Sequence, residues 1–363
     1  SNALYTANDF EFSGTAEAKG KDADTYKMGL KKDQFKNTSK NFTNVEFVVT
    51  DGQLVIGKRT VTLTSGSDSK IYNGKPLTNG EVTVTGDGFA KGEGATYDVT
   101  GTITNVGETD NTFTYTLNEG TKAGNYEITK TEGKLIVTAD ASEVVVTITE
   151  NSANITYDGN EHEATGYTTS ITGGTDYKEE DFTFNGNASV KGTDAGTYNM
   201  ELKPEDFQNT NNNYSKVKFI IVDGTLTISK RNVTLTSASD EKVYDGNALT
   251  NNKVTESVDG FAKGEGATYD VTGSQTETGS SKNTFTYTLN EGTNADNYEI
   301  TKAEGTLKVT PVTDQVTVTI TGNTGSVTYD GNSHQVTGYT TSFSNALYTA
   351  NDFEFSGTAE ASR

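Results

Sequence analysis

Two histidines are the residues whose type and spacing first suggest chemistry. His162 and His334 lie 172 residues apart, each just after a Tyr-Asp-Gly turn sequence. Zinc sites need three or four converging ligands, and the chain offers no cysteine to add to these histidines. Ser-His-Asp catalysis is disfavoured as well, because no nucleophile elbow is present. We therefore expect a turn role for both histidines, no enzymatic activity, and no catalytic, cofactor-binding or metal-binding residues.

The most repeated short motif is Tyr-Asp/Asn-Gly. Asp-Gly and Asn-Gly pairs tolerate positive φ and make tight turns, beneath which the tyrosine can pack. A calcium site would need six to eight oxygen ligands, and no EF-hand-like spacing appears. The motif is therefore predicted to be structural. Its copies are Tyr72-Asn73-Gly74, Tyr157-Asp158-Gly159, Tyr244-Asp245-Gly246 and Tyr329-Asp330-Gly331.

A covalent cross-link is a further hypothesis. Surface proteins without disulfides sometimes join a buried lysine to an asparagine beside a carboxylate. Lys130 and Lys302 lie on segments of alternating polarity, with Asn125 and Asn297 nearby in the sequence. These four residues are the candidates for such an isopeptide bond.

The elements that would position these residues recur along the chain. GFAKGEGATYDVTG at 88–101 returns unchanged at 260–273, and TYDGN at 156–160 returns at 328–332. Self-similarity at a long fixed period is the mark of an array of structural units. Two kinds of repeat alternate within the period, and we name them repeat A and repeat B.

The repeats predict five segments. They are a partial repeat A with its closing half (1–59), repeat B (60–139), repeat A (140–231), repeat B (232–311) and a partial repeat A with its opening half (312–363). The sequence SNALYTANDFEFSGTAEA opens the chain and returns at 344–361. Because the chain begins within a repeat, we expect it to be part of a longer protein.

Composition excludes several classes of partner. The net charge of −21 argues against nucleic acid and anionic membrane surfaces, and no apolar run approaches a membrane span. Apolar residues make up only 31% of the chain, but they alternate with threonine, which allows a thin core on one face of each strand. We therefore expect a folded chain rather than a disordered one.

Period-two patterning predicts an all-β fold. Val61 and Leu63 alternate with threonine, as do Val144, Val146 and Ile148. Six or seven strands per repeat fit a tandem array of small, Ig-like β-sandwich domains. A β-grasp-like mixed sheet with one short helix per repeat is the alternative, because the first and last strands could pair in parallel.

Turn residues refine this picture. Asp223-Gly224 in repeat A and Glu132-Gly133 in repeat B each separate two alternating runs, which predicts a closing hairpin. One short helical turn is expected at 203–207, where Pro204 suits the first helical position. Arg59 and Arg231 lie at the passage from A to B, where a guanidinium could pin a domain joint.

The repeats resemble a known family. A Tyr-Asp-Gly turn, GTYNMEL at 196–202 and the closing segment NYSKVKFIIVDGTLTISKR at 213–231 resemble the YDG/MBG-type tandem repeats of bacterial (Gram-positive) surface adhesins. The resemblance implies a large secreted or cell-wall-anchored protein of the bacterial surface, with a role in adhesion and no catalytic residues. We expect the repeats to form an elongated stalk that presents a distant binding domain.

Two kinds of partner are expected. In the alternative function, the repeats bind mucin or host glycans weakly and multivalently, with Tyr167 and Tyr339 as the glycan contacts. The other partner is a neighbouring copy of the chain, joined head-to-tail through 1–59 and 316–361, since each of these segments supplies strands that the other lacks.

Overall fold

The computed structural model describes residues 2–362, and it confirms the all-β expectation. Short 3-10 turns are the helical elements that it contains over these residues. The chain forms two compact units, and each is described by itself. The first comprises the residues up to Ile148 with Thr169–Gly186 and Lys203–Ile221, and the second Thr149–Thr168, Asn187–Leu202 and the residues from Val222 onward.

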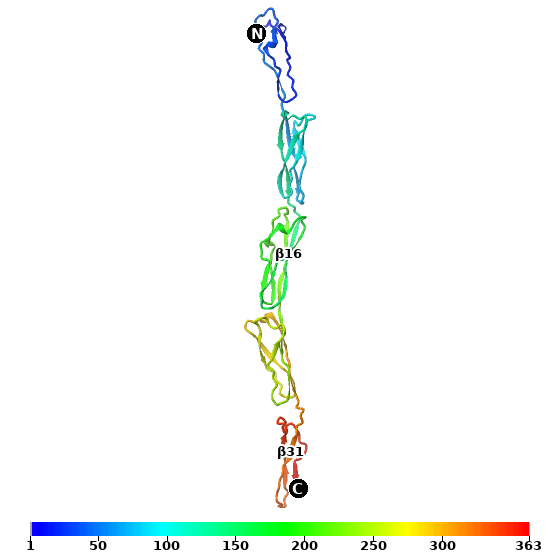
Figure 1. Cartoon of the computed structure of the whole chain (residues 1–363), viewed down its shortest axis with the longest axis vertical. Helices are drawn as coiled ribbons and strands as arrows, with labels where there is room; N and C mark the ends of the chain where they lie inside the picture. The colour runs from blue at the N-terminus through cyan, green and yellow to red at the C-terminus, as the bar shows by residue number, and fades with distance from the viewer. Residues whose placement is uncertain (1, 363) are drawn as a thin grey trace. The chain divides into compact units, whose positions relative to one another are not determined.

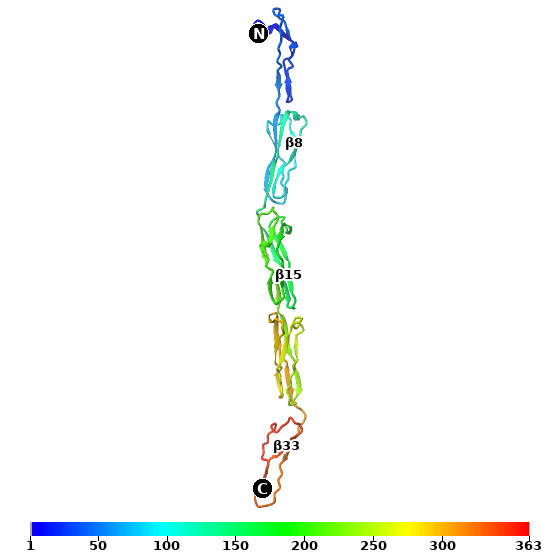
Figure 2. The ribbon, with the colours of Figure 1, turned by 90° about the vertical axis from the view of Figure 1, so that its left-hand side faces the viewer.

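The first repeat B lies in the first compact unit. Two three-stranded sheets, ordered β11-β5-β7 and β6-β12-β9, and the pair β10-β8 form it; β8 is labelled in Figure 2. Its eight strands exceed the six or seven expected. The elements are β5 (Arg59–Ser65), β6 (Asp68–Ile71), β7 (Val82–Gly86), β8 (Ala95–Val99), β9 (Gly107–Asn111), β10 (Phe113–Leu117), η3 (Ala123–Asn125), β11 (Tyr126–Thr131) and β12 (Gly133–Thr138).

The second repeat B repeats this arrangement within the second compact unit. Its sheets are ordered β25-β23-β29, β24-β30-β27 and β26-β28. The elements are β23 (Arg231–Ser237), β24 (Asp240–Val243), β25 (Val254–Glu256), β26 (Ala267–Val271), β27 (Gly279–Lys282), β28 (Phe285–Leu289), η6 (Ala295–Asn297), β29 (Tyr298–Ala303) and β30 (Thr306–Thr310).

The core of repeat B follows the predicted alternation. Val61 and Leu63 are buried on β5 and pack with Phe113 and Tyr126, while Leu135 and its neighbours form a second cluster under β12. Burying such side chains contributes about 1.5–3 kcal/mol each. The small sheets with apolar inner faces fit the expected tandem β-sandwich-like domains.

Parallel pairing is the feature that the β-grasp-like alternative anticipated. β5 pairs in parallel with β11, from Arg59 opposite Tyr126 to Thr64 opposite Thr131, and β6 pairs in parallel with β12. The sheets are therefore mixed. The single short helix of that alternative is a 3-10 turn, η3, which leads directly into β11.

The predicted closing hairpins are wrong. The strands on either side of Glu132-Gly133 belong to different sheets, and so do those on either side of Asp223-Gly224. The φ angles of both glycines lie outside the left-handed region, so neither is a turn glycine. A Cβ on Gly133 would lie 2.4 Å from the Ser65 carbonyl oxygen, and one on Gly224 would lie 2.5 Å from that of Asn151. Each glycine permits a close backbone approach where the chain changes sheets.

The complete repeat A contributes to both compact units. In the first unit it forms the sheets β16-β13-β21 and β17-β20, with β16 labelled in Figure 1. These elements are β13 (Val144–Glu150), β16 (Tyr167–Thr172), η4 (Glu179–Asp181), β17 (Phe182–Phe184), η5 (Pro204–Asp206), β20 (Phe207–Asn209) and β21 (Val217–Val222). Pro204 occupies the start of η5, as predicted.

In the second unit, repeat A forms the sheet β14-β22-β19 and the pair β15-β18. The elements are β14 (Ala153–Thr156), β15 (His162–Thr165), β18 (Ser189–Gly192), β19 (Gly196–Asn199) and β22 (Thr225–Ser229). β22 is the central strand, with β14 parallel on one side and β19 antiparallel on the other.

Over the described residues 2–362, the strands of the two partial repeats are joined in pairs. The N-terminal one holds η1 (Ala7–Asp9), β1 (Phe10–Phe12), β2 (Thr25–Lys27), η2 (Lys32–Gln34), β3 (Phe35–Asn37) and β4 (Gln53–Val55), paired β1-β3 and β2-β4. The C-terminal one holds β31 (Val318–Gly322), β32 (Gln335–Thr337), β33 (Tyr339–Phe343) and β34 (Glu360–Ser362), paired β31-β33 and β32-β34.

Candidate functional site

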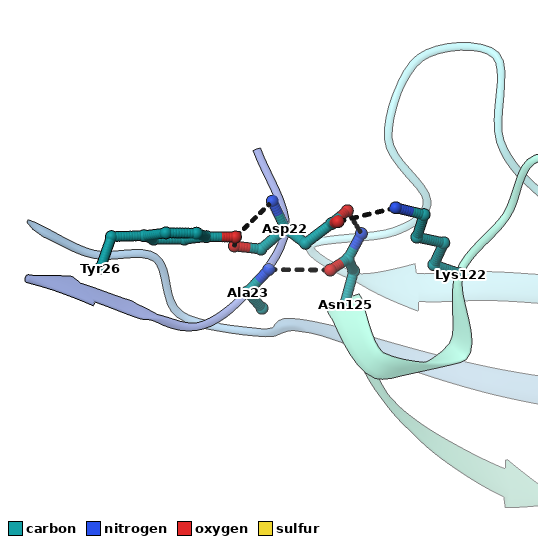
Figure 3. A network of polar contacts seen from close by, with 5 residues as sticks. All are labelled: Asp22, Ala23, Tyr26, Lys122 and Asn125. Carbon is teal, nitrogen blue, oxygen red and sulfur yellow. Dashed lines mark hydrogen bonds and ion pairs between the residues drawn. The ribbon is translucent and has the colours of Figure 1, made fainter. Parts of the chain in front are cut away.

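Side chains from different repeats meet at joints within each compact unit, and these joints are the candidate functional sites. At the first joint, between the N-terminal partial A and the first B, Asn125 ends η3 with its carboxamide facing repeat A (Figure 3). Its Oδ1 accepts the N–H of Ala23 at 2.8 Å, and its Nδ2 donates to Asp22 Oδ1 at 3.1 Å. A single carboxamide thus binds both a backbone and a side-chain group of the neighbour.

Lys122 completes this first network. Its ammonium lies 2.7 Å from Asp22 Oδ2 (Figure 3), and its hydrogen bond, followed by that of Asn125, lowers the pKa of Asp22 below its ordinary value. The backbone of Asp22 is held in turn by the Tyr26 hydroxyl, which donates to the carbonyl oxygen at 3.1 Å.

The joint between the complete A and the second B repeats the carboxamide contact. Asn297 Oδ1 accepts the N–H of Ala195 at 2.7 Å, and Nδ2 donates to Asp194 Oδ1 at 2.9 Å. Asn297 is buried, so both bonds are shielded from water. We call this pair of bonds from one asparagine the carboxamide clamp. Asn294 stands where the first joint has Lys122, so the clamp recurs without the ion pair.

Tyrosine and glutamate side chains add further contacts at this joint between the complete repeat A and the second repeat B, which we call the second joint. The hydroxyl of Tyr157, in the Tyr-Asp-Gly turn of repeat A, donates to Glu265 Oε1 of repeat B, and Tyr298 donates to Oε2 at 2.8 Å. The two tyrosine rings meet edge to face at 5.5 Å. Burial, and then the bond to Glu265, raise the pKa of Tyr157 to about 12, so this hydroxyl stays a donor at neutral pH.

Arg231 binds carbonyl oxygens at this passage, which confirms the predicted joint role for this arginine. Arg231 donates through Nε to Gly260 O at 2.8 Å, through Nη1 to Tyr157 O at 3.3 Å, and through Nη2 to Asp259 O. It therefore touches both repeats. Arg59 makes the bonds to Gly88 and Asp87 of the first repeat B, and its carbonyl partners lie in that repeat alone.

A different asparagine serves the joint from the first B to the complete A. Asn213 Oδ1 accepts the N–H of Val106 at 2.8 Å, and its Nδ2 donates to Asn105 Oδ1 at 3.2 Å. Beside it, the ring of Tyr214 is buried against Tyr72 of the Tyr-Asn-Gly turn, with centroids 5.5 Å apart. This joint also combines a carboxamide with an aromatic pair.

The predicted turn motif is observed. Its glycines have φ between 73° and 85°. His162 Nε2 lies 2.8 Å from Asp158 Oδ1, and His334 makes the same contact with Asp330 at 2.7 Å. The backbone N–H of Asn160, and then His162, lower the pKa of Asp158 to about 2. Within residues 2–362, no group of three or more His, Asp or Glu side chains could hold a metal ion.

The isopeptide candidates lie in separate networks. The ammonium of Lys130 pairs with Glu132 at 2.8 Å and lies over the Phe113 ring, whereas Asn125 serves the first joint. Lys302 likewise lies over Phe285, whereas Asn297 serves the second joint. The cross-link hypothesis is therefore wrong for these pairs, and the asparagines have another role.

The two predicted glycan-contact tyrosines are half-buried. Tyr167 is the first residue of β16, a strand labelled in Figure 1, and Tyr339 is the first residue of β33, a strand labelled in Figure 2. The Tyr339 ring packs against Phe355 with centroids 5.2 Å apart, and both line a groove of about 360 Å³. The structure does not bring these tyrosines into the joints.

The sequence analysis missed the residues that the asparagines of the clamp bind, which are an aspartate and the following alanine at each joint. The signal was present, since Asp-Ala occurs at 22–23 and again at 194–195, and Asn-Tyr-Glu-Ile begins at the last residue of η3 and of η6 alike. Identical residues at both contact points of two joints indicate a shared contact. No helix within residues 2–362 has the length and apolar character needed to span a membrane.

Comparison with known proteins gives one result for the complete repeat A. No curated protein matches the chain. Residues 144–230 match the family model described as the MBG domain, which confirms the resemblance named from the sequence. This repeat of the chain is therefore similar to an MBG domain.

Proposed function

We propose that the chain is a non-catalytic repeat region of a secreted or cell-wall-anchored bacterial adhesin, acting as an elongated stalk for a distant binding domain. The observation that carries the proposal is the carboxamide clamp, made by Asn125 at one joint and by Asn297 at another. The same polar contact recurs at two joints between repeats, as expected of a structural contact rather than of a single active site. Such use of polar side chains suits a protein that has to hold its repeats in order.

Short passages between repeats support the same function. Only Lys230 separates the last strand of repeat A, which ends at Ser229, from the first strand of repeat B, which begins at Arg231. A passage of this length cannot let two domains tumble freely. The net charge of −21 adds repulsion between neighbouring molecules, which keeps surface-anchored stalks apart.

Small-angle X-ray scattering tests the stalk. A compact 363-residue globule has a radius of gyration of about 21 Å and a maximum dimension of roughly 60–70 Å, whereas three complete and two partial repeats in line should exceed about 100 Å. We expect the longer value in dilute solution. A maximum dimension near that of the globule contradicts the proposal.

A second candidate is weak, multivalent binding of mucin or host glycans. The groove beside Tyr339 and Phe355 is the observation that favours it, because sugars stack on aromatic rings. The test is a glycan and mucin array probed with the chain and with its Tyr167→Ala and Tyr339→Ala variants. Signal that is lost in the variants supports the candidate, and unchanged or absent signal contradicts it.

A further inference from the structure

The first and last strands of repeat B lie side by side and run in the same direction. In the first repeat B, the pairing of β5 with β11 starts at Arg59 opposite Tyr126, and that of β6 with β12 ends at Ile71 opposite Thr138. The sequence separation of the partners is the same in both stretches, so the register continues unchanged where the chain passes from one sheet to the other. We call this parallel pairing of β5 and β6 with β11 and β12 the terminal ladder.

Serine side chains carry the terminal ladder across the change of sheet. Ser65 Oγ accepts the N–H of Gly133 at 2.9 Å, and Ser67 Oγ accepts the N–H of Lys134 at 3.0 Å. Ser65 is buried, so its bond is shielded from water. The two sides of the ladder are therefore also hydrogen-bonded between the two stretches of backbone pairing.

The other complete repeats have the same construction. In the second repeat B, β23 pairs in parallel with β29 and β24 with β30, and Ser237 and Ser239 accept the N–H groups of Gly305 and Thr306 at 3.0 Å each. In the complete repeat A, β14 pairs in parallel with β22, and Glu150 takes the place of the buried serine. The ladder is thus a shared feature of the repeats.

The direction of the ladder decides how it responds to tension. The chain enters the first repeat B at the Arg59 end of the ladder and leaves it at the Thr138 end. Tension along the chain therefore pulls the two parallel sides in opposite directions along their own length. Hydrogen bonds in a parallel pair are evenly spaced, so they bear this load together. An antiparallel pair that is pulled apart at adjacent ends, such as β8 and β10, instead loses its bonds one after another.

We infer that the terminal ladder makes each complete repeat resist tension applied through the chain, which is a load-bearing function beyond reach alone. That such tension occurs rests on the proposed function, because a stalk anchored at one end and bound at the other is pulled at both. The resistance itself belongs to the repeat, and forced unfolding is governed by the unfolding rate. Scattering tests the stalk and pulling tests the ladder, so the two can fail separately.

Single-molecule pulling in two directions tests the inference, since the chain has no cysteine of its own and handles can be attached to introduced ones. In the full chain, Lys58→Cys with Ala141→Cys loads the first repeat B along the terminal ladder. Thr96→Cys with Thr116→Cys loads the same repeat across β8 and β10, where these residues lie opposite each other. All four positions are exposed. We expect a several-fold higher unfolding force along the ladder.

Both directions unfold the same repeat, so a difference in force cannot come from a difference in its folding stability. Equal forces in the two directions, or a higher force across β8 and β10, overturn the inference. Hydrogen exchange of β5 and β12 in the unloaded variants checks that the repeat is folded. The second repeat B provides an independent measurement, with Lys230→Cys and Thr313→Cys along the ladder and Thr268→Cys and Thr288→Cys across β26 and β28.

Discussion

Each repeat has a glycine where the chain changes sheets, Gly224 in repeat A and Gly133 in the first repeat B. Their backbone N–H groups donate to different kinds of side chain. In repeat B, the buried Ser65 Oγ accepts the N–H of Gly133 at 2.9 Å and donates to the Asn111 carbonyl at 2.6 Å. In repeat A, the buried Glu150 accepts the N–H groups of Gly224 at 2.7 Å and Leu202 at 2.8 Å. A hydroxyl and a carboxylate therefore serve one backbone geometry.

This difference shows that the glycine is strictly required, whereas the type of side chain that accepts its N–H is not. The glycine cannot change, because a backbone carbonyl lies where its Cβ would be, whereas the acceptor can change provided that every buried N–H is satisfied. A buried carboxylate needs more donors than a hydroxyl, and repeat A supplies a second N–H from Leu202.

Core truncation should affect both repeats alike. Leu135 in the first B, Leu307 in the second B and Leu226 in A are each 0% exposed. Substituting any one by alanine should lower the free energy of unfolding of its repeat by about 2–5 kcal/mol. Amide hydrogen exchange of the neighbouring strands measures this for each repeat separately. A shift within error at one position would show that its strand faces away from the core.

Alanine at the closing glycines should also affect both repeats. Gly133→Ala and Gly224→Ala should each cost about 3 kcal/mol, because the added Cβ overlaps a backbone carbonyl. Gly124→Ala is the control, since no atom lies within 4 Å of its Cβ position. If Gly224→Ala unfolded no more readily than this control, the close approach would not be the reason for glycine there.

Removing the side chain that accepts the glycine N–H should destabilise only the repeat that contains it. Ser65→Ala leaves the N–H of Gly133 without its acceptor, which should cost about 2 kcal/mol in the first repeat B. Glu150→Gln should cost a similar amount in repeat A, because its amide NH₂ would face an N–H group. The measurement is hydrogen exchange at Gly133 and Gly224. Equal protection in wild type and variants would contradict the role given to both acceptors.

The smallest effect concerns the turn of the two B repeats. Lys242, followed by the N–H of Asn247, lowers the pKa of Asp245, whereas the first B has Asn73 at this position. A lowered folded-state pKa gives stability that is present above about pH 4 and is lost as pH falls through the folded pKa. The second B should therefore lose slightly more stability in acid than the first. Asn73→Asp should remove that difference in an acid titration followed by NMR, and no change would contradict it.

The sequence predicted the strands and turns better than it predicted which strands pair with one another. The alternation of apolar residues with threonine predicted the buried faces of β5 and β13, and the preference of proline for the first helical position predicted η5. Both predictions succeed because they depend on local geometry. Asp223-Gly224 was misread as a hairpin, since the same dipeptide serves a turn and a change of sheet. Only the tertiary contact with Asn151 distinguishes the two cases. Nothing local encodes such a contact.

The joints show the same limit. Arg231 was predicted at a joint from its position alone, and its carbonyl contacts confirm this. Asn125 and Asn297 were noticed but were assigned to a cross-link, because their acceptors lie about a hundred residues away in the sequence. The repetition of Asp-Ala was the available clue. Comparing both sides of a repeated joint would have found the clamp.

The most direct test of the central claim is the distance distribution across the joint that Asn297 closes. Spin labels on cysteines introduced at Thr197 and Glu299, both exposed, lie on either side of that joint. Double electron–electron resonance should give one narrow distance in the wild-type background and a broad distribution with Asn297→Ala. A distribution that is already broad with Asn297 in place would contradict the claim that the clamp holds the repeats together.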